Sequence, residues 1–191
     1  MPTMDGVTFL RKSMELRPMP VIMVSSLTQA GAEITLEALE IGAVDFIAKP
    51  AHDVAKGMEA LAGELQAKVK AAAHTRMLAR RAAPPPRMAR RERLAHSREK
   101  IVAIGASTGG VEALKVVLTG LPAECPPILI TQHMPPRFTS AFAERLNREC
   151  AMTVSEAKHN DFVEHNHVYI APGGLHLELI RQGGEFRCSL S

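Results

Sequence analysis

Short apolar runs alternate with amphipathic stretches along the first 70 residues of the chain. The runs 20–25 and 44–48 are rich in Val, Ile and Phe and are bounded by turn-forming or polar residues, which predicts two buried strands. Helical patterns surround these strands and lie between them, in the stretches from Asp5 to about Met14, across Leu36–Gly42 and from about Asp53 onward. Helices that alternate with strands in this way are typical of a mostly parallel sheet.

The same alternation returns at Lys100. Expected strands cover 101–106, 128–132, 168–173 and 176–180, and expected helices cover 111–118 and 139–149. Gly183-Gly184 follows the last strand and predicts a hairpin. The first two strands and the helix between them form a βαβ unit, in which the carboxyl ends of both strands lie at the same edge of the sheet. Both parts of the chain are therefore expected to have an α/β fold.

The stretch 71–98 lacks an apolar period and is rich in Ala, Arg and Pro. Between residues 71 and 100, eight arginines and one lysine oppose two glutamates, which gives +7, so the rest of the chain carries −4 of the net +3. This composition indicates a linker between two domains, at 1–70 and 99–191. Basic segments can also bind nucleic acid, but this one has no aromatic residues for base stacking, and we expect no nucleic-acid partner.

The composition argues against several other classes of protein. No apolar run approaches the length of about 18 residues that a membrane span needs, and no basic segment leads into an apolar one at the N-terminus. Neither membrane insertion nor secretion is therefore expected. The three cysteines are scattered without a Cys-x-x-Cys pair, which is typical of free thiols in a cytoplasmic protein.

A serine and a histidine follow the first two strands of the second domain. Gly105-Ala-Ser107-Thr-Gly109 matches G-x-S-x-G between a strand and a helix, the setting in which a nucleophilic serine is held on a tight turn. His133 follows the next strand, 26 residues later. Neighbouring parallel strands lie about 4.8 Å apart, so His133 is a candidate general base for Ser107. The amides that open the following helix are candidate oxyanion donors.

Other interpretations of these residues stay open at this point. A strand, a glycine-rich turn and a helix can also bind the phosphate of a dinucleotide. The pattern G-x-G-x-x-G is not met, however, and the next strand ends in Gln132-His133 rather than in an acidic residue for a ribose. The glycines can also form a plain turn, and His133 can have only a structural hydrogen bond.

Four histidines in the last third of the chain raise the question of a metal site. They are His159, His165, His167 and His176. Two of them, His165 and His167, would share one face of a strand. No zinc-like second pair accompanies them, so no metal is expected.

Three motifs then give the second domain a specific resemblance. They are Gly-Ala-Ser107-Thr-Gly-Gly, Gln132-His133-Met-Pro-Pro-Arg-Phe-Thr, and Val168-Tyr-Ile-Ala-Pro-Gly173 with His176. Together they resemble the catalytic domain of chemotaxis protein-glutamate methylesterases of the CheB type. The resemblance implies hydrolysis of glutamate methyl esters on methyl-accepting chemoreceptors, with release of methanol, and deamidation of receptor glutamines. It makes Ser107 the nucleophile and His133 its base, places Thr108, Gly109 and Gly110 at the oxyanion site, and implies no cofactor for catalysis.

The first 50 residues resemble part of a response-regulator receiver domain. Met-Pro-Thr-Met-Asp5-Gly6 is similar to the loop after the phospho-acceptor strand, Ser25 to the hydroxyl residue at a strand end, and Lys49-Pro50 to the lysine–proline element. Ser25 would then contact the phosphoryl group, Lys49 would pair with it, and the Lys49–Pro50 bond would be cis. A chemotaxis histidine kinase would supply the phosphoryl group, and the unphosphorylated receiver would cover the active site.

The chain is thus identified as a member of the CheB family: a partial, flavodoxin-like receiver domain, a basic linker, and the N-terminal part of a parallel-sheet, Rossmann-like methylesterase domain. By this resemblance the phospho-acceptor Asp would lie three residues before Met1, with the Mg²⁺ ligands further upstream. The third triad member, an Asp, would lie beyond residue 191. We therefore expect the chain as given to be inactive, impaired or poorly folded. The alternative is a non-catalytic signalling or receptor-binding remnant.

Overall fold

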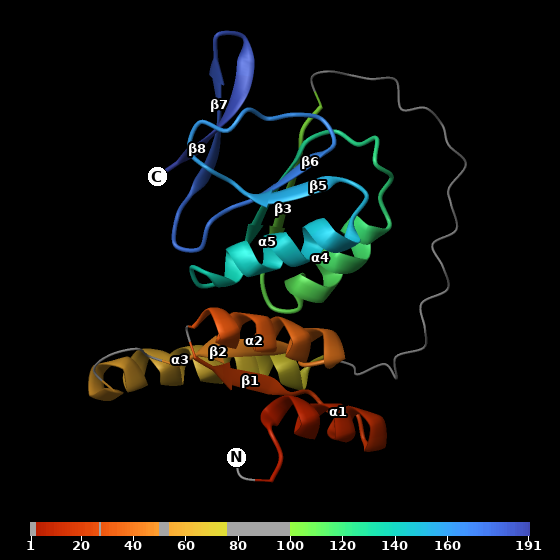
Figure 1. Ribbon diagram of the computed structural model, residues 1–191. Coiled ribbons are helices and arrows are strands. Elements are labelled where there is room, and N and C mark those ends of the chain that lie inside the picture. Colours follow the sequence, from red (N-terminus) through yellow and green to blue (C-terminus); the bar gives the residue numbers. More distant parts are fainter. Residues whose placement is uncertain (1–2, 27, 50–53, 76–99) are drawn as a thin grey trace.

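The computed structural model describes residues 3–26, 28–49, 54–75 and 100–191; at Gln29 and residues 54–60 it describes the backbone alone (Figure 1). The N-terminal part has the elements α1 (Gly6–Leu16), β1 (Ile22–Ser25), α2 (Gln29–Ile41), β2 (Asp45–Ala48) and α3 (Val54–Ala73). Strands β1 and β2 pair in parallel, which confirms the alternation expected from the sequence. Helix α3 continues three residues past the expected domain boundary at residue 70.

Local chemistry explains where the first two helices begin and end. The Asp5 side chain accepts a hydrogen bond of 2.8 Å from Thr8 N, and Thr28 caps α2 in the same way through Gly31 N. Helix α2 stops at Gly42, whose φ of 129° suits a residue without a Cβ. The expected helix start at Asp5 and the expected helix end at Gly42 are both confirmed.

The C-terminal part forms a four-stranded sheet followed by a hairpin. Its elements are β3 (Val102–Ala106), α4 (Gly110–Thr119), β4 (Ile128–Gln132), α5 (Phe138–Glu149), β5 (Thr153–Glu156), β6 (His167–Ile170), β7 (Leu177–Gln182) and β8 (Glu185–Leu190). The sheet has the order β3-β4-β6-β5 with all neighbours parallel, and β7 and β8 pair antiparallel across the expected hairpin.

Strand β5 is the one element here that the sequence pattern did not predict. It is four residues long and lies at an edge of the sheet, and one of its four residues is buried. A single buried Val154 in a polar surrounding gives no period-2 signal, because an edge strand of this length covers little of the core.

Alternation along the strands divides the apolar side chains between two layers. Ile128 and Ile130 of β4 belong to the large core that includes α4 and α5, whereas Leu129 between them belongs to a smaller cluster. That smaller cluster also contains Tyr169 and Cys188, so it lies on the side of the sheet where the hairpin packs (Figure 1). Burial raises the pKa of the Cys188 thiol to about 11, which makes it an inert structural cysteine.

The N-terminal part packs against the helical side of the C-terminal part. Helix α2 lies along α5 and α4, which separate it from the four-stranded sheet (Figure 1). Phe46 of β2 stacks on Phe138 at the start of α5, with ring centroids 4.7 Å apart and planes 11° from parallel. One hydrophobic core therefore runs through both parts of the chain.

Two expectations from the sequence lie outside the described residues: the Lys49–Pro50 peptide bond and most of the linker at 71–98. Among the helices that are described, none combines the length and the apolar character needed to cross a membrane.

Candidate active site

The βαβ unit brings the ends of β3 and β4 together. Ala106 pairs with Gln132 as the last pair in the register, and His133 N donates a hydrogen bond of 3.0 Å to Ala106 O. Ser107 and His133 are the next residues on the two strands, and both are exposed. The expectation that the carboxyl ends of these two parallel strands lie side by side at one edge of the sheet is therefore confirmed.

The residues after Ser107 form a tight turn into α4. Gly109 has a φ of 75°, in the left-handed region where a residue with a side chain is strained. Gly110 N donates a hydrogen bond of 2.7 Å to Ser107 O. The family resemblance places the Gly110 amide at the oxyanion site, but in this structure the amide donates its hydrogen bond to the backbone of the turn itself.

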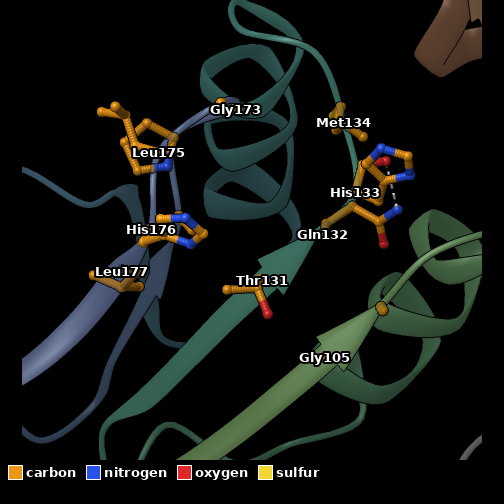
Figure 2. Close-up of a pocket in the computed structure, with 13 residues that line it drawn as sticks. Gly105, Thr131, Gln132, His133, Met134, Gly173, Leu175, His176 and Leu177 are labelled. Carbon is orange, nitrogen blue, oxygen red and sulfur yellow. Dashed lines mark hydrogen bonds between the residues drawn. The ribbon is translucent and has the colours of Figure 1, made fainter. Parts of the chain in front are cut away.

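A pocket of about 480 Å³ lies beside these strand ends (Figure 2). His133 and Met134 line it after β4, and the segment 171–177 after β6 supplies a facing wall that includes His176. Ser107 is not among the lining residues. The wall fits closely against the segment after β4, since a Cβ added at Gly173 would lie 2.5 Å from the Met134 carbonyl oxygen.

Thr139, in the first turn of α5, holds the pocket wall in place through a hydrogen bond to Gly173. It is fully buried, its hydroxyl donates a hydrogen bond of 2.5 Å to Glu156 Oε1, and it accepts one of 3.1 Å from Gly173 N. This role was not predicted from the sequence. A threonine in the first turn of a helix is too common a feature to indicate it.

Gln132 is a second residue near the pocket whose contacts were not predicted from the sequence. It is 8% exposed, and its Nε2 donates hydrogen bonds to the carbonyl oxygens of Ser107 and His133. The available signal was a large amide side chain at the end of a strand that begins with the apolar run Ile-Leu-Ile.

The N-terminal part reaches the serine turn through Asp45. The Thr108 hydroxyl donates a hydrogen bond of 2.9 Å to Asp45 Oδ2. The other oxygen of Asp45 accepts hydrogen bonds from Phe46 N at 2.7 Å and from Lys68 Nζ at 3.3 Å. A carboxylate of β2 is therefore bonded to the residue that directly follows Ser107.

A second polar contact between the two parts centres on Glu40 of α2. Lys115 of α4 and Arg145 of α5 both donate to its carboxylate, with Arg145 Nε 2.7 Å from Oε1. Burial alone would raise the pKa of Glu40, but the hydrogen bonds from Lys115 and Arg145 outweigh it and hold this pKa below its usual value. Burial likewise opposes the charge of Lys115, and its bonds to Glu149 and Glu40 still raise its pKa.

The residues expected to contact a phosphoryl group lie together at the ends of β1 and β2. Ser25 pairs with Ala48 in the register, and Lys49 N donates a hydrogen bond of 2.7 Å to Ser25 O. The Ser25 hydroxyl donates to Gly31 O at 3.2 Å, and the Lys49 side chain is exposed.

The histidines of the last third have separate surroundings. His167 Nε2 is 2.8 Å from Ser155 Oγ, and the ring stacks on Tyr169. His159 Nδ1 accepts a hydrogen bond from Leu190 N. Strand β6 begins at His167, so the expectation that His165 shares its strand face is wrong. Across the described residues, no three His, Cys, Asp or Glu side chains come together as a metal site.

Comparisons with known proteins agree with the motifs. Residues 102–190 match the family model described as CheB methylesterase. The chain is 55% identical, over 97% of its length, to the protein-glutamate methylesterase/protein-glutamine glutaminase 2 of Pseudomonas aeruginosa, and covers 53% of that protein. It is 51% identical over its whole length to the corresponding protein of Pectobacterium atrosepticum, and covers 55% of it. The CheB methylesterase catalytic domain of Thermotoga maritima is 46% identical over 48% of this chain and 49% of that one, with a TM-score of 0.46. The chain thus spans about half the length of the curated relatives it matches.

Proposed function

Because residues 102–190 of the chain match the family model described as CheB methylesterase, we propose that this chain is part of a protein-glutamate methylesterase that uses Ser107 and His133. Its substrates are γ-glutamyl methyl esters on chemoreceptors, and receptor glutamines in a second, deamidating reaction. The observation that carries the proposal is the pairing of Ala106 with Gln132, which makes Ser107 and His133 the next residues after two neighbouring strands, with His133 lining the pocket.

The proposed reaction is acyl transfer through the serine. Ser107 Oγ attacks the ester carbonyl carbon, and its proton passes to His133. The negative charge of the tetrahedral intermediate lies close to the start of α4, where the amides of Thr108 and Gly109 and the helix dipole favour an anion. The bond to the methoxy group then breaks, and His133 returns the proton so that methanol leaves.

Water completes the cycle. His133 removes a proton from water, which attacks the acyl-serine ester and releases the glutamate carboxylate and the free Ser107 hydroxyl. With a glutamine substrate the first leaving group is ammonia, and the second step is the same. Neither step needs a cofactor.

We further propose that the N-terminal part of this chain comes from a receiver domain, of which it is the C-terminal portion. In this proposal it restrains the active site. The support is the hydrogen bond from Thr108 to Asp45 and the contact of Glu40 with Lys115 and Arg145. Phosphorylation by a chemotaxis histidine kinase, sensed by Ser25 and Lys49, would loosen these contacts. Mg²⁺ would assist that phosphorylation, but the described residues offer no cluster of side chains to hold the ion, and no step is assigned to it.

The direct test is release of methanol from a methyl-esterified receptor peptide by the protein at the full length of its relatives, because the chain covers only 53% and 55% of two of them and is itself expected to be impaired. We expect Ser107→Ala to lower the rate by about 10³-fold or more, because it removes the nucleophile. Ser189→Ala, in the hairpin strand β8, is the matched control and should release methanol at the wild-type rate. A folded wild-type protein of that full length that releases none would instead favour the non-catalytic signalling or receptor-binding alternative.

A further inference from the structure

One side-chain nitrogen is bonded to both residues of the proposed catalytic pair. Gln132 Nε2 donates a hydrogen bond of 3.0 Å to Ser107 O and one of 3.3 Å to His133 O. Figure 2 shows the Gln132 side chain extending from the end of β4 beside His133, with the bond to that residue drawn as a dashed line. The side chain is 8% exposed, so water does not compete strongly for these bonds.

The chemistry of the two partners fixes which way the amide faces. Both are carbonyl oxygens, which can only accept hydrogen bonds, so the NH₂ group must point toward them. The oxygen, Oε1, then faces Gly110 so closely that a Cβ at Gly110 would overlap it. Within the described part of the chain this buried Oε1 has no hydrogen-bond partner.

An unpaired buried oxygen is unfavourable, and an apolar side chain of the same length would fill the space without it. The amide is therefore best explained by what its nitrogen does. The regular ladder between β3 and β4 ends with the bond from His133 N to Ala106 O. Beyond that bond, the Gln132 amide joins the backbone of Ser107 to the backbone of His133.

We infer that Gln132 is a positioning residue that holds the serine turn and the end of β4 at a fixed separation, and so keeps the Ser107 hydroxyl in line with the His133 ring. The inference rests on the proposed roles of Ser107 and His133. A misplacement of about 1 Å between reacting groups can lower a rate by about 10²-fold, which sets the scale of the expected effect.

The test compares Gln132→Met with Gln182→Met, the same change at an exposed glutamine at the end of β7. The first readout is hydrogen exchange of two backbone amides of the strand-end region, His133 N–H and Gly110 N–H. We expect Gln132→Met to speed their exchange at least tenfold. Ala171 N–H, which bonds to Ile130 O deeper in the same sheet, is the internal control and should be unchanged.

The second readout is the rate at which a fluorophosphonate probe labels Ser107, measured by mass spectrometry. In this reaction the serine oxygen bonds to phosphorus, fluoride leaves, and the serine proton passes to His133. We expect labelling about 10- to 100-fold slower in Gln132→Met, at the same apparent affinity for the probe, and a wild-type rate in Gln182→Met. If Gln132→Met does not fold, Gln132→Asn, which keeps the donor but cannot reach both carbonyl oxygens, takes its place.

Unchanged exchange at His133 and Gly110, or unchanged labelling in a labelling-competent protein, would overturn the inference. Faster exchange at all three amides would mean that Gln132 only stabilises the fold, and would also overturn it. A wild-type chain that the probe does not label contradicts the proposed function, and the exchange data then decide the positioning role by themselves.

Discussion

Gly173 lies where the pocket wall meets the segment that follows β4. A Cβ at this position would lie 2.5 Å from Met134 O, from the Pro135 carbonyl carbon and from Pro136 N. All three are backbone atoms, so none can move aside as a flexible side chain would. The residue is therefore glycine because two backbone segments touch there.

We expect Gly173→Ala to lower the free energy of unfolding by about 1–3 kcal/mol, because the backbone must shift to admit the methyl group. Urea unfolding measures this change. Gly63→Ala in α3 is the control, since nothing lies within 4 Å of its added Cβ. In a helix that substitution should stabilise by up to about 1 kcal/mol. Equal stabilities of the two variants would contradict the close approach at Gly173.

At the level of single residues, the sequence was informative where the signal was local. Ser107 and His133 could be chosen from the motif and from their places after two apolar strands. Gln132 and Thr139 could not, because each acts through contacts between segments far apart along the chain. The engagement of the Gly110 amide by Ser107 O depends on the conformation of the turn and is likewise not visible in a motif.

At the level of elements, helix α2 is joined to α4 and α5 by the Glu40 carboxylate. The folded-state pKa of Glu40 is held below its ordinary value of 4.5, so its contribution is fully present above pH 4.5 and is lost as the pH falls through the lower, folded-state value. Lys115 behaves in the opposite sense: its pKa is raised above 10.5, so its contribution is lost only at strongly alkaline pH.

We expect Glu40→Gln to lower the free energy of unfolding at neutral pH by roughly 1–3 kcal/mol, because it weakens hydrogen bonds to two charged groups. The difference from wild type should shrink as the pH falls below 4.5. The variant should also release methanol faster if the contact restrains the active site. Glu37→Gln, on the same helix in an exposed pair with Arg11, is the control and should change little. A pH-independent difference would show that the charge of Glu40 is not the cause.

The elements themselves followed from the hydrophobic pattern, with the short edge strand β5 as the exception. Each expected helix and strand of the described residues has its counterpart, because apolar periods of 2 and 3.6 residues report directly on local structure. Helix α2 begins at Gln29, however, seven residues before the stretch that the sequence indicated. Strand β5 has too few buried residues to show a period.

At the level of the whole molecule, the alternation of helices and strands predicted two α/β parts but not how they pack. That packing depends on non-local contacts such as the stack of Phe46 on Phe138 and the bond from Thr108 to Asp45. Neither pair has a signature in the sequence, because the partners are 92 and 63 residues apart. The result is a single core that links the N-terminal part to the serine turn.

In the proposed reaction Ser107 carries the acyl group during ester hydrolysis. We would acid-quench the protein, at the full length of its relatives, during turnover of a methyl-esterified receptor peptide, and analyse its proteolytic fragments by mass spectrometry. We predict a peptide-sized adduct on the fragment that contains Ser107, absent from Ser107→Ala and present in Ser189→Ala. Methanol release with no adduct on that fragment, or with an adduct on another residue, would show that Ser107 is not the nucleophile.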